Sequence, residues 1–418
     1  MAEVRPFRAL HYEPSSVGSM GEVTAPPYDV IDEAERAELM ARSPFNVVEL
    51  DLPLSPREDG DPYAHAAELL EGWLMAGVLS QDREPTIWAL TQDYTGPDGE
   101  SRRRNSILAR VRVTDYGPGQ VRPHERTQPG PKQDRLDLTR ATRYNLSPIF
   151  SLTTRNAWKH VEPATAAAPW AEVTDPDGTV HRLWPVDDPV IHDAVTDELA
   201  GAELLIADGH HRYETARTYR DEIGGEGAHE FTLMALTGLD DPGLTVFPTH
   251  RLLTDLDSAG LDRLRDDLEG SFEMIEVTGE GGLDPVAEEP TGCFGFADRT
   301  GARFMLRLRD PGILAGLMPD RSDAYRTLDA AILEKVVFEA MLDMSEADVE
   351  AKRGIGYAKT IGEALDRLES DRADAAFLLR PTPIEQVRAV ADAGETMPPK
   401  STYFFPKLLS GMAFNPLS

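Results

Sequence analysis

Apolar and polar positions recur along this chain with two spacings, which separate its expected helices from its expected strands. Helical spacing covers residues 32–40, 61–76, 190–199, 328–344, 361–370 and 385–393. Short apolar or alternating runs predict strands at 45–50, 86–94, 106–113, 147–153, 204–207, 231–239, 292–297, 303–308 and 375–379. Because these elements do not follow a regular strand–helix–strand cadence, the pattern predicts an α+β or mixed α/β fold.

Two stretches interrupt this pattern. Residues 122–143 are polar and charged, and Pro129-Gly130-Pro131 at their centre predicts a loop. An acidic, Gly- and Pro-containing linker covers residues 279–291, and the character of the chain changes from about Leu253. At 418 residues the chain is too long for one ordinary core. We therefore expect a core domain at 1–252 and an α/β region at 253–418 whose tail can return to the core.

The most informative segment runs from Leu204 to Ala216. A buried strand is expected to end at Asp208-Gly209, and a helix-compatible segment then opens with His210, His211 and Arg212. Glycine at such a turn lets a ligand approach the backbone, and the N–H groups of the following helix attract an anion. Arg212 adds a guanidinium, whose donors match a phosphate. The segment predicts a phosphate-binding turn, whereas its plainer interpretation is a capped helix start with surface histidines.

Four further clusters carry chemistry, although each also fits an ordinary surface turn, cap or packed tail. They are the charged loop Pro123-His124-Glu125-Arg126-Thr127 with Lys132, Asp134 and Arg135; the stiff turn Pro26-Pro27-Tyr28-Asp29; the segment Pro248-Thr249-His250-Arg251; and the tail Met397-Pro398-Pro399-Lys400-Ser401-Thr402-Tyr403-Phe404-Phe405-Pro406-Lys407. Only seven of the 42 basic residues are lysines, so a tail with two of them is unusual. Lys400, Ser401 and Thr402 are candidates for closing the site over a ligand.

Composition excludes several classes of protein. A net charge of −31 argues against general binding to nucleic acid or to an anionic membrane. The single cysteine, Cys293, excludes an internal disulfide framework and a multi-cysteine zinc site. The N-terminus lacks the pattern of a signal peptide, and no apolar run has the length of a membrane span. We expect a cytoplasmic protein that binds neither nucleic acid nor membrane, from a halophile or a high-GC organism.

The sequence contains none of the common metal-binding or nucleotide-binding motifs. His210, His211 and Glu214 do not match the inverted zincin motif His-x-x-Glu-His, and adjacent histidines in such a turn tend to point apart. We expect no metal ion held by the protein alone, and consider a nucleotide-borne Mg²⁺ that Asp208 or Glu125 contacts. The chain has no Walker sequence and no Gly-x-Gly-x-x-Gly fingerprint, which disfavours the common nucleotide-binding folds.

Taken together, these motifs resemble the bacterial and archaeal domain-of-unknown-function family 1015. The resemblance runs in order from Arg5 to the C-terminus, on Ala25-Pro26-Pro27-Tyr28-Asp29-Val30, His124-Glu125-x-Thr127, Lys132-x-Asp134-Arg135, Ser147-Pro148-Ile149-Phe150, Asp208-Gly209-His210-His211-Arg212-Tyr213, Pro248-Thr249-His250-Arg251 and Met397-Pro398-x-Lys400-Ser401-Thr402-Tyr403-Phe404. That family is similar in turn to the ParB/sulfiredoxin fold, which places nucleotide phosphates at a Gly-x-x-Arg turn. The resemblance implies a ParB/sulfiredoxin-like nucleotide-binding core.

Within that superfamily the resemblance favours the free-serine kinases, which carry a similar Asp-Gly-His-His-Arg turn. Sulfiredoxin chemistry is excluded because His210 stands where sulfiredoxin has its cysteine. A ParB-type DNA clamp lacks support because no basic helix is visible. The resemblance implies phosphoryl transfer from ATP or ADP, with Mg²⁺, to the hydroxyl of free L-serine or a similar metabolite.

The candidate residues then take the following roles. Gly209, His210, His211 and Arg212 would bind phosphates, aided by Lys400, Ser401 and Thr402. Asp208 is the first candidate for the catalytic acid residue, Glu125 the second and Asp29 the third. His124, Arg135 and Arg251 are candidates for binding the acceptor. Two alternatives stay open, namely a nucleotide-binding regulatory protein with slow or no hydrolysis, and a metal-dependent hydrolase.

Overall fold

The computed structural model describes residues 2–96, 99–125 and 129–418, and these fold into two compact units. The first unit takes in Met1–Pro123, Thr127–Thr245 and Pro406–Ser418. The second takes in His124–Arg126 and Val246–Phe405. The end of the chain therefore belongs to the same unit as its beginning.

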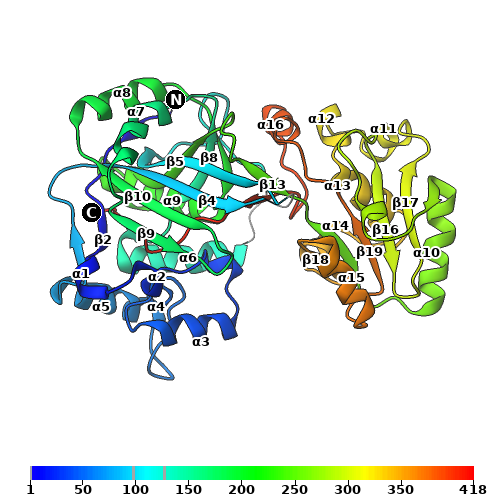
Figure 1. The fold of residues 1–418 in the computed structure, drawn as a ribbon, viewed down its shortest axis with the longest axis horizontal. Coiled ribbons are helices and arrows are strands. Elements are labelled where there is room, and N and C mark those ends of the chain that lie inside the picture. The colour runs from blue at the N-terminus through cyan, green and yellow to red at the C-terminus, as the bar shows by residue number, and fades with distance from the viewer. Residues whose placement is uncertain (1, 97–98, 126–128) are drawn as a thin grey trace. The chain divides into compact units, whose positions relative to one another are not determined.

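A large mixed sheet forms the centre of the first unit (Figure 1). Among the described residues it has nine strands, in the order β6-β11-β8-β12-β5-β4-β10-β9, with β1 paired to β5. Strand β12 runs parallel to β8, and β11 runs antiparallel to β8. The strands are β1 (Val4–Arg5), β4 (Ile87–Thr95), β5 (Ser101–Arg112), β6 (Val121–Arg122), β8 (Ile149–Thr153), β9 (Ala171–Thr174), β10 (Val180–Val186), β11 (Leu204–Asp208) and β12 (Phe231–Gly238).

Helices and two small strand pairs surround this sheet. The helical segments are α1 (Pro14–Val17), α2 (Met20–Val23), η1 (Tyr28–Val30), α3 (Glu33–Arg42), α4 (Val48–Asp51), α5 (Pro62–Met75), α6 (Pro129–Thr142), α7 (Trp158–Val161), η2 (Glu162–Ala166), α8 (Pro189–Leu199), α9 (His210–Ile223) and η3 (Ala228–Glu230). Strand β2 (Leu10–Tyr12) pairs with β3 (Leu79–Gln81), and β7 (Tyr144–Asn145) pairs with β21 (Asn415–Pro416).

The core of the first unit lies between the sheet and helices α7, α8 and α9. Val195 of α8 and Tyr213 of α9 join strand residues such as Ile107, Ile206 and Met234 in one buried apolar cluster. Burying such side chains is the main favourable contribution to folding, about 25 cal/mol per Å² of apolar surface. This packing fixes α9, and with it the turn that precedes α9.

The second unit is built on an antiparallel sheet (Figure 1). Six strands of its described residues lie in the order β15-β17-β16-β19-β14-β18. They are β14 (His250–Leu253), β15 (Phe272–Glu276), β16 (Cys293–Asp298), β17 (Arg303–Leu308), β18 (Ile355–Ala358) and β19 (Ala375–Leu378), while β20 (Tyr403–Phe405) pairs with β13 (Thr245–Phe247). Alanine and leucine side chains of α15 (Ile361–Glu369) pack on one face of this sheet.

The remaining helical segments of the second unit include one unusual element. The regular ones are α10 (Ser258–Ser271), η4 (Gly281–Leu283), α11 (Ile313–Leu317), α12 (Asp323–Arg326), α13 (Asp329–Ile332), α14 (Glu346–Glu350) and α16 (Ile384–Asp392). Segment η5 (Leu333–Glu339) is a π-helix that directly continues α13. π-Helical turns are rare and occur frequently at functional sites.

The expected mixed α/β fold is confirmed, and so are most of the predicted elements. The strand at 45–50 is wrong, because the chain there forms a turn followed by α4. The cause is Asn46, which is fully buried. Its amide donates to the carbonyl of Glu22 (2.7 Å), and its oxygen accepts from the N–H of Val48 (3.0 Å). These local bonds replace the hydrogen bonds that a strand would have made.

The predicted loop at 122–143 is also wrong, since most of it forms helix α6. Pro129 and Pro131 lie in the first turn of α6, where a helix has no partner for the N–H that proline lacks. Lys132, Asp134 and Arg135 therefore stand on a helix. Arg126 and Thr127 of the charged loop lie outside the described residues.

Candidate functional site

The turn between β11 and α9 has the backbone conformation that its sequence predicts. Gly209 has φ +95°, a left-handed conformation that costs other residues strain, and it directly precedes the 14-residue helix α9. No side chain caps this helix start. The first N–H groups of α9 and its positive dipole end thus lie beside Asp208, a position suited to a negatively charged group.

Asp208 lies between two cations. Its Oδ1 accepts from the ammonium of Lys407 (2.8 Å), and its Oδ2 accepts from Nη2 of Arg212 (2.7 Å). Burial by itself would raise the pKa of this carboxyl, but Lys407 and Arg212, with a contribution from His210, hold the pKa well below its usual range. Asp208 is therefore ionised at any physiological pH.

This pairing disfavours the role of catalytic base that the sequence analysis put first for Asp208. An efficient base has a pKa near the working pH and an oxygen free for the proton. Asp208 has a strongly lowered pKa, and each of its oxygens accepts from a cation. The geometry instead fits a positioning residue that holds Lys407 and Arg212 at the start of α9.

Arg212 folds back over the turn. Its guanidinium also donates to the carbonyl of Pro148 and to the hydroxyl of Ser147, the latter at 3.2 Å. A β-carbon added to Gly209 would lie 2.9 Å from Nε of Arg212, so glycine makes room for the guanidinium here. The β11–β8 pairing shifts register between Ile206 and Asp208, an irregularity that turns the end of a strand.

Lys407 reaches Asp208 because buried groups hold the backbone next to it. The amide of Gln92 donates to the carbonyl of Lys407 (2.9 Å), and Arg104 donates to the carbonyl of Pro406 (2.6 Å). Burial lowers the pKa of Arg104 to about 10, and Nε of Arg104 donates to the Gln92 oxygen (3.0 Å). Gln92 also lies 3.2 Å from Nδ1 of His181. The end of the chain is thereby locked to strands β4, β5 and β10.

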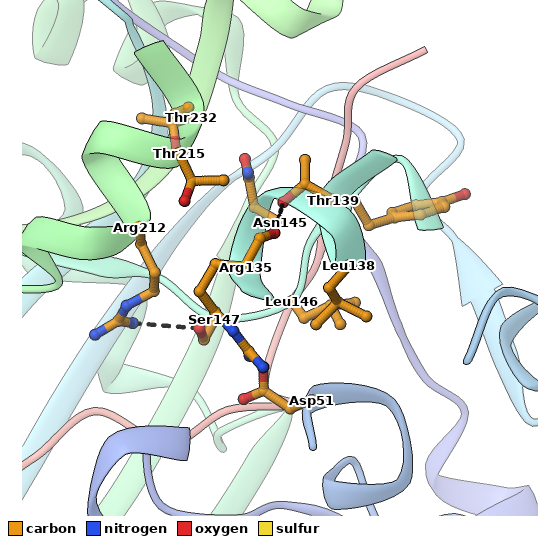
Figure 2. A pocket seen from close by; sticks show the side chains of 12 residues that line it. Asp51, Arg135, Leu138, Thr139, Asn145, Leu146, Ser147, Arg212, Thr215 and Thr232 are labelled. Carbon is orange, nitrogen blue, oxygen red and sulfur yellow. Dashed lines mark hydrogen bonds and ion pairs between the residues drawn. The ribbon is translucent and has the colours of Figure 1, made fainter. Parts of the chain in front are cut away.

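A small polar pocket adjoins Arg212 (Figure 2). Its volume is about 40 Å³, enough for water or a small ion but not for a nucleotide. Arg212 and Ser147 lie on one side, and Arg135 of α6 points toward Asp51 on the other (Figure 2). Asn145 and Thr215 complete its polar lining.

Arg135 is already paired within the first unit. Its Nη1 donates to Asp51 (2.8 Å), its Nε donates to Asp134 (2.8 Å), and its guanidinium lies 4.1 Å from the ring centre of Tyr28. Burial raises the pKa of Tyr28 to about 12. An acceptor carboxylate would have to compete with two aspartates for Arg135. Asp29, the next residue after Tyr28, is exposed on η1.

The two histidines occupy the first turn of α9. His210 is buried, at 6% exposure, and His211 is partly exposed. His210 is close enough to Asp208 to contribute to the lowered pKa of that carboxyl. The first unit therefore brings together Asp208, Gly209, His210, His211 and Arg212 in one turn.

The other predicted site residues belong to the second unit. Nε2 of His124 lies 2.8 Å from the hydroxyl of Thr402, and the neighbouring Glu125 forms a β-bridge with Met397. The hydroxyl of Ser401 donates to the carbonyl of Pro398 (2.6 Å). Lys400 is exposed and has φ +57°. Arg251 is buried on β14.

Sequence reasoning missed several residues of the site in the first unit. Lys407 belongs to the unusual lysine-containing tail, but the sequence-based prediction named Lys400 as the lysine of that tail that binds phosphate. Gln92 and Arg104 lie within expected strands and belong to no motif. Their only signal in the sequence is that each is a polar residue on a strand that is expected to be buried. Asp51 directly follows residues 45–50, which were predicted as a strand and instead form a turn and the start of α4.

In residues 2–96, 99–125 and 129–418, no three His, Cys, Asp or Glu side chains gather in a way that holds a metal ion. Each oxygen of Asp208 already accepts from a cation, and this disfavours a metal ion as a third cation beside Lys407 and Arg212. The residues of this turn do not fit a protein-held ion. No helix of these ranges has the length and apolar character to cross a membrane.

Comparison with protein families places the chain in one of them. The model of the family described as "Protein of unknown function (DUF1015)" matches residues 4–331, more than half of the chain. The protein belongs to the DUF1015 family. No curated protein matches the chain.

Some solved structures show a distant likeness. A conserved hypothetical protein from Pyrococcus furiosus shares 16% identity over 69% of this chain and 88% of its own, with a TM-score of 0.34. A free serine kinase in complex with AMP shares 15% identity over 71% of this chain and 88% of its own, with a TM-score of 0.36. C-terminally truncated SbnI from Staphylococcus aureus shares 11% identity over 72% of this chain and 85% of its own, with a TM-score of 0.36.

Proposed function

We propose that this protein is a small-molecule kinase that transfers a phosphoryl group from ATP or ADP to the hydroxyl of free L-serine or a similar metabolite. The observation that carries this proposal is the turn at Asp208: a left-handed Gly209, an uncapped helix start, and Arg212 and Lys407 held beside it by one carboxylate. The motif resemblance to free-serine kinases at residues 208–213 supports the choice of acceptor.

The turn offers what phosphoryl transfer requires. The reaction depends mainly on positioning the phosphates and neutralising their charge. In our proposal the N–H groups that open α9, with Arg212 and Lys407, bind the phosphates of the donor, and His210 and His211 flank them. The terminal P–O bond of the nucleotide breaks as the acceptor oxygen bonds to phosphorus, and the acceptor hydroxyl loses its proton.

The proposal gives Asp208 a positioning role and leaves the proton acceptor to another acid residue. Glu125 and Asp29 are the remaining candidates from the sequence. Mg²⁺ would enter with the phosphates of the nucleotide and neutralise part of their charge. Glu125→Gln and Asp29→Asn, assayed side by side, identify the acid residue by the larger loss of kcat.

Phosphorus NMR tests the reaction directly. Full-length protein is incubated with Mg²⁺, ATP or ADP, and a panel of hydroxylated metabolites that includes L-serine. A new phosphomonoester signal that requires L-serine is the expected result. Nucleotide binding without any phosphoester would contradict the proposal and favour a regulatory protein. Release of phosphate that needs a bound transition metal but no acceptor would favour a metal-dependent hydrolase.

Two lysine variants test the site itself. Lys407→Met removes one of the two cations from Asp208, and we expect kcat/KM to fall about 100-fold, as for loss of one preorganised charge-stabilising donor. Lys159→Met is the control, because Lys159 is a lysine of the same unit that pairs with Glu198 in a largely exposed ion pair. Equal losses in both variants would reject the assignment of Lys407. Circular dichroism confirms that both variants fold.

A further inference from the structure

A row of buried polar side chains crosses the sheet of the first unit. His181 on β10 lies directly opposite Gln92 on β4, and Gln92 lies directly opposite Arg104 on β5. All three side chains are fully buried. Residues that lie opposite each other on neighbouring strands share a face of the sheet, so their side chains meet. Because a buried polar group is costly without a hydrogen bond, the members of this row have to bond to one another and to the protein around them.

The amide of Gln92 joins this row to the end of the chain. Its oxygen accepts from Nε of Arg104 (3.0 Å), and its NH₂ group donates to the carbonyl of Lys407 (2.9 Å). A guanidinium only donates and a carbonyl only accepts, so the amide serves both of these partners in one orientation alone. In that orientation the NH₂ group also lies 3.2 Å from Nδ1 of His181 and directs its second N–H at the imidazole ring.

The other side of the His181 ring decides which of its nitrogens carries the proton. Nε2 of His181 lies 2.9 Å from Oδ2 of Asp175, and Oδ1 of Asp175 accepts from the N–H of Thr179 (2.9 Å). A carboxylate only accepts hydrogen bonds, so Nε2 of His181 donates to Asp175. In the neutral ring Nδ1 is then the acceptor for the amide of Gln92. Each group from Asp175 to the carbonyl of Lys407 thus has its role as donor or acceptor set by its neighbour.

A proton on Nδ1 of His181 is incompatible with this arrangement. The new N–H would face an N–H of Gln92, and two donors do not bond to each other. Turning the amide over would pair it with His181, but it would set donor against donor at Arg104 and oxygen against oxygen at the carbonyl of Lys407. Burial lowers the pKa of His181 below its usual 6.5, Asp175 opposes this effect and Arg104 adds to it, so the ring is neutral near pH 7.

We propose that His181 is a positioning residue that controls Lys407 through Gln92: the neutral ring holds the backbone of Lys407 in place, and protonation of the ring releases it. Lys407 then loses the fixed backbone from which its ammonium group reaches Asp208 (2.8 Å). The inference rests on the proposed function for the role of Lys407 at the donor phosphates. It adds control by protons to that site, because phosphate binding should weaken as His181 takes up its proton.

The rest of the tail has anchors of its own. Ser410 forms a β-bridge with Ala25, and Phe414 forms one with Leu10. These bridges lie beyond Lys407 and do not depend on the bonds of Gln92. Protonation of His181 should therefore free the segment around Lys407 without unfolding the first unit.

NMR of the lysine and histidine side chains, recorded on the full-length protein without nucleotide, tests this coupling. The chain has seven lysines and ten histidines, and Lys407→Met and His181→Asn identify the two signals of interest. We expect the signals of Lys407 and of the His181 ring to change with one common midpoint below pH 6.5. A constant Lys407 signal while His181 titrates would overturn the proposal. A His181 ring that stays neutral down to global unfolding would overturn it as well.

Two variants separate the acceptor at His181 from the donors of Gln92. His181→Asn places an amide oxygen where Nδ1 lies, so it keeps the acceptor for Gln92 but takes up no proton. Its Lys407 signal should stay constant between about pH 7.5 and 5. Gln92→Glu keeps an acceptor for Arg104 but removes both donors, so Lys407 should be released at every pH. If either variant does not fold, the two midpoints of the wild type decide.

Other histidines supply the control and the competing explanation. His192 on α8 is buried, and its Nε2 lies 2.7 Å from the carbonyl of Val186, so His192→Asn is a matched control that should titrate like the wild type. His210 and His211 lie beside Asp208 and can also take up protons in this range. A Lys407 signal that still titrates in His181→Asn would assign the effect to these two and overturn the proposal.

The outcomes separate this inference from the proposed function. In the kinase assay, kcat/KM for the nucleotide should fall as His181 takes up its proton, and this step should be missing from His181→Asn. Gln92→Glu should lower kcat/KM about 100-fold at every pH, the loss expected for Lys407→Met. A common midpoint for His181 and Lys407 without phosphoester formation refutes the kinase and leaves the control of Lys407 standing. Phosphoester formation with unrelated midpoints refutes this inference and leaves the kinase standing.

Discussion

The two units differ in how their buried charges are paired. At the start of α9 in the first unit, Asp208 pairs with both Lys407 and Arg212, and the pKa of the carboxyl is held well below its usual range. In the second unit, Arg251 and Glu334 are more deeply buried but stay apart, and the pKa of Glu334 is raised to about 6. The fold stabilises the first arrangement and tolerates the second.

This difference indicates that the two sets of charges have different roles. Paired charges hold a geometry, so the Asp208 turn is prepared before any ligand arrives. Buried charges without a partner lower stability. Removing the charge of Asp208 should therefore lower stability, and removing the charge of Glu334 should raise it. Two substitutions test this difference, and a third tests the glycine of the turn.

Asp208→Asn should cause the largest loss of stability. It leaves Lys407 and Arg212 beside each other without a counter-charge, and we expect a loss of about 2–3 kcal/mol, below the value for a fully buried pair because the Asp208 side chain is 18% exposed. The measurement is urea denaturation. Glu222→Gln, which breaks an exposed pair with Arg140, should cost less than about 1 kcal/mol.

The effect of Asp208→Asn on stability should also depend on pH in the acid range. Because the folded-state pKa of Asp208 lies below the unfolded value of 3.8, its contribution to stability is fully present well above pH 3.8 and is lost as the pH falls below that value. Asp208→Asn should therefore match the wild type more closely as the pH falls toward 3. A constant difference over that range would mean that the paired carboxylate does not stabilise the turn.

Glu334→Gln should act in the opposite direction. A folded-state pKa of about 6 against an unfolded value of 4.5 means that the ionised carboxylate destabilises the protein above pH 6, and that this penalty vanishes below about pH 4.5. The glutamine variant should gain about 2 kcal/mol at pH 7.5 and nothing at pH 4.5. Thermal unfolding at the two values checks this. Equal stability at pH 7.5 would show that Glu334 already has a partner.

Gly209→Ala should have the smallest effect on stability and a clear effect on the turn. Alanine at φ +95° costs about 1–2 kcal/mol, and its β-carbon would displace the guanidinium of Arg212. The control is Gly77→Ala: Gly77 follows α5 in the left-handed conformation of a helix end (φ +68°), and no atom lies within 4 Å of the added carbon. We expect comparable urea midpoints and a loss of nucleotide binding, followed by fluorescence, in Gly209→Ala alone. Unchanged binding would remove Arg212 from the phosphate site.

The sequence predicted the local features of the first site and missed the distant ones. Leu204 to Arg212 lie on consecutive elements, so hydrophobic pattern and a glycine were enough to place strand, turn and helix. Lys407 lies almost two hundred positions from Asp208. It was missed because its placement depends on buried Gln92 and Arg104, whose hydrogen bonds exist only in the folded sheet.

Each error has its own physical cause. Pro129 and Pro131 predict a loop, although the start of a helix tolerates proline, and Asn46 redirects an apolar run into a helical turn. Glu334 was not predicted to be buried, because the apolar spacing around it is typical of an ordinary amphipathic helix. Only the folded unit shows that this acid is buried without a partner.

Residues 406–418 are part of the first unit, and this affects the order in which the unit folds during synthesis. A ribosome makes Asp208 and Arg212 long before it makes Lys407. Strands made earlier can already pair, but the Asp208 carboxylate has one of its two cations only after Lys407 is made. The proposed phosphate site therefore has both of its cations only after residues 406–418 have joined the sheet.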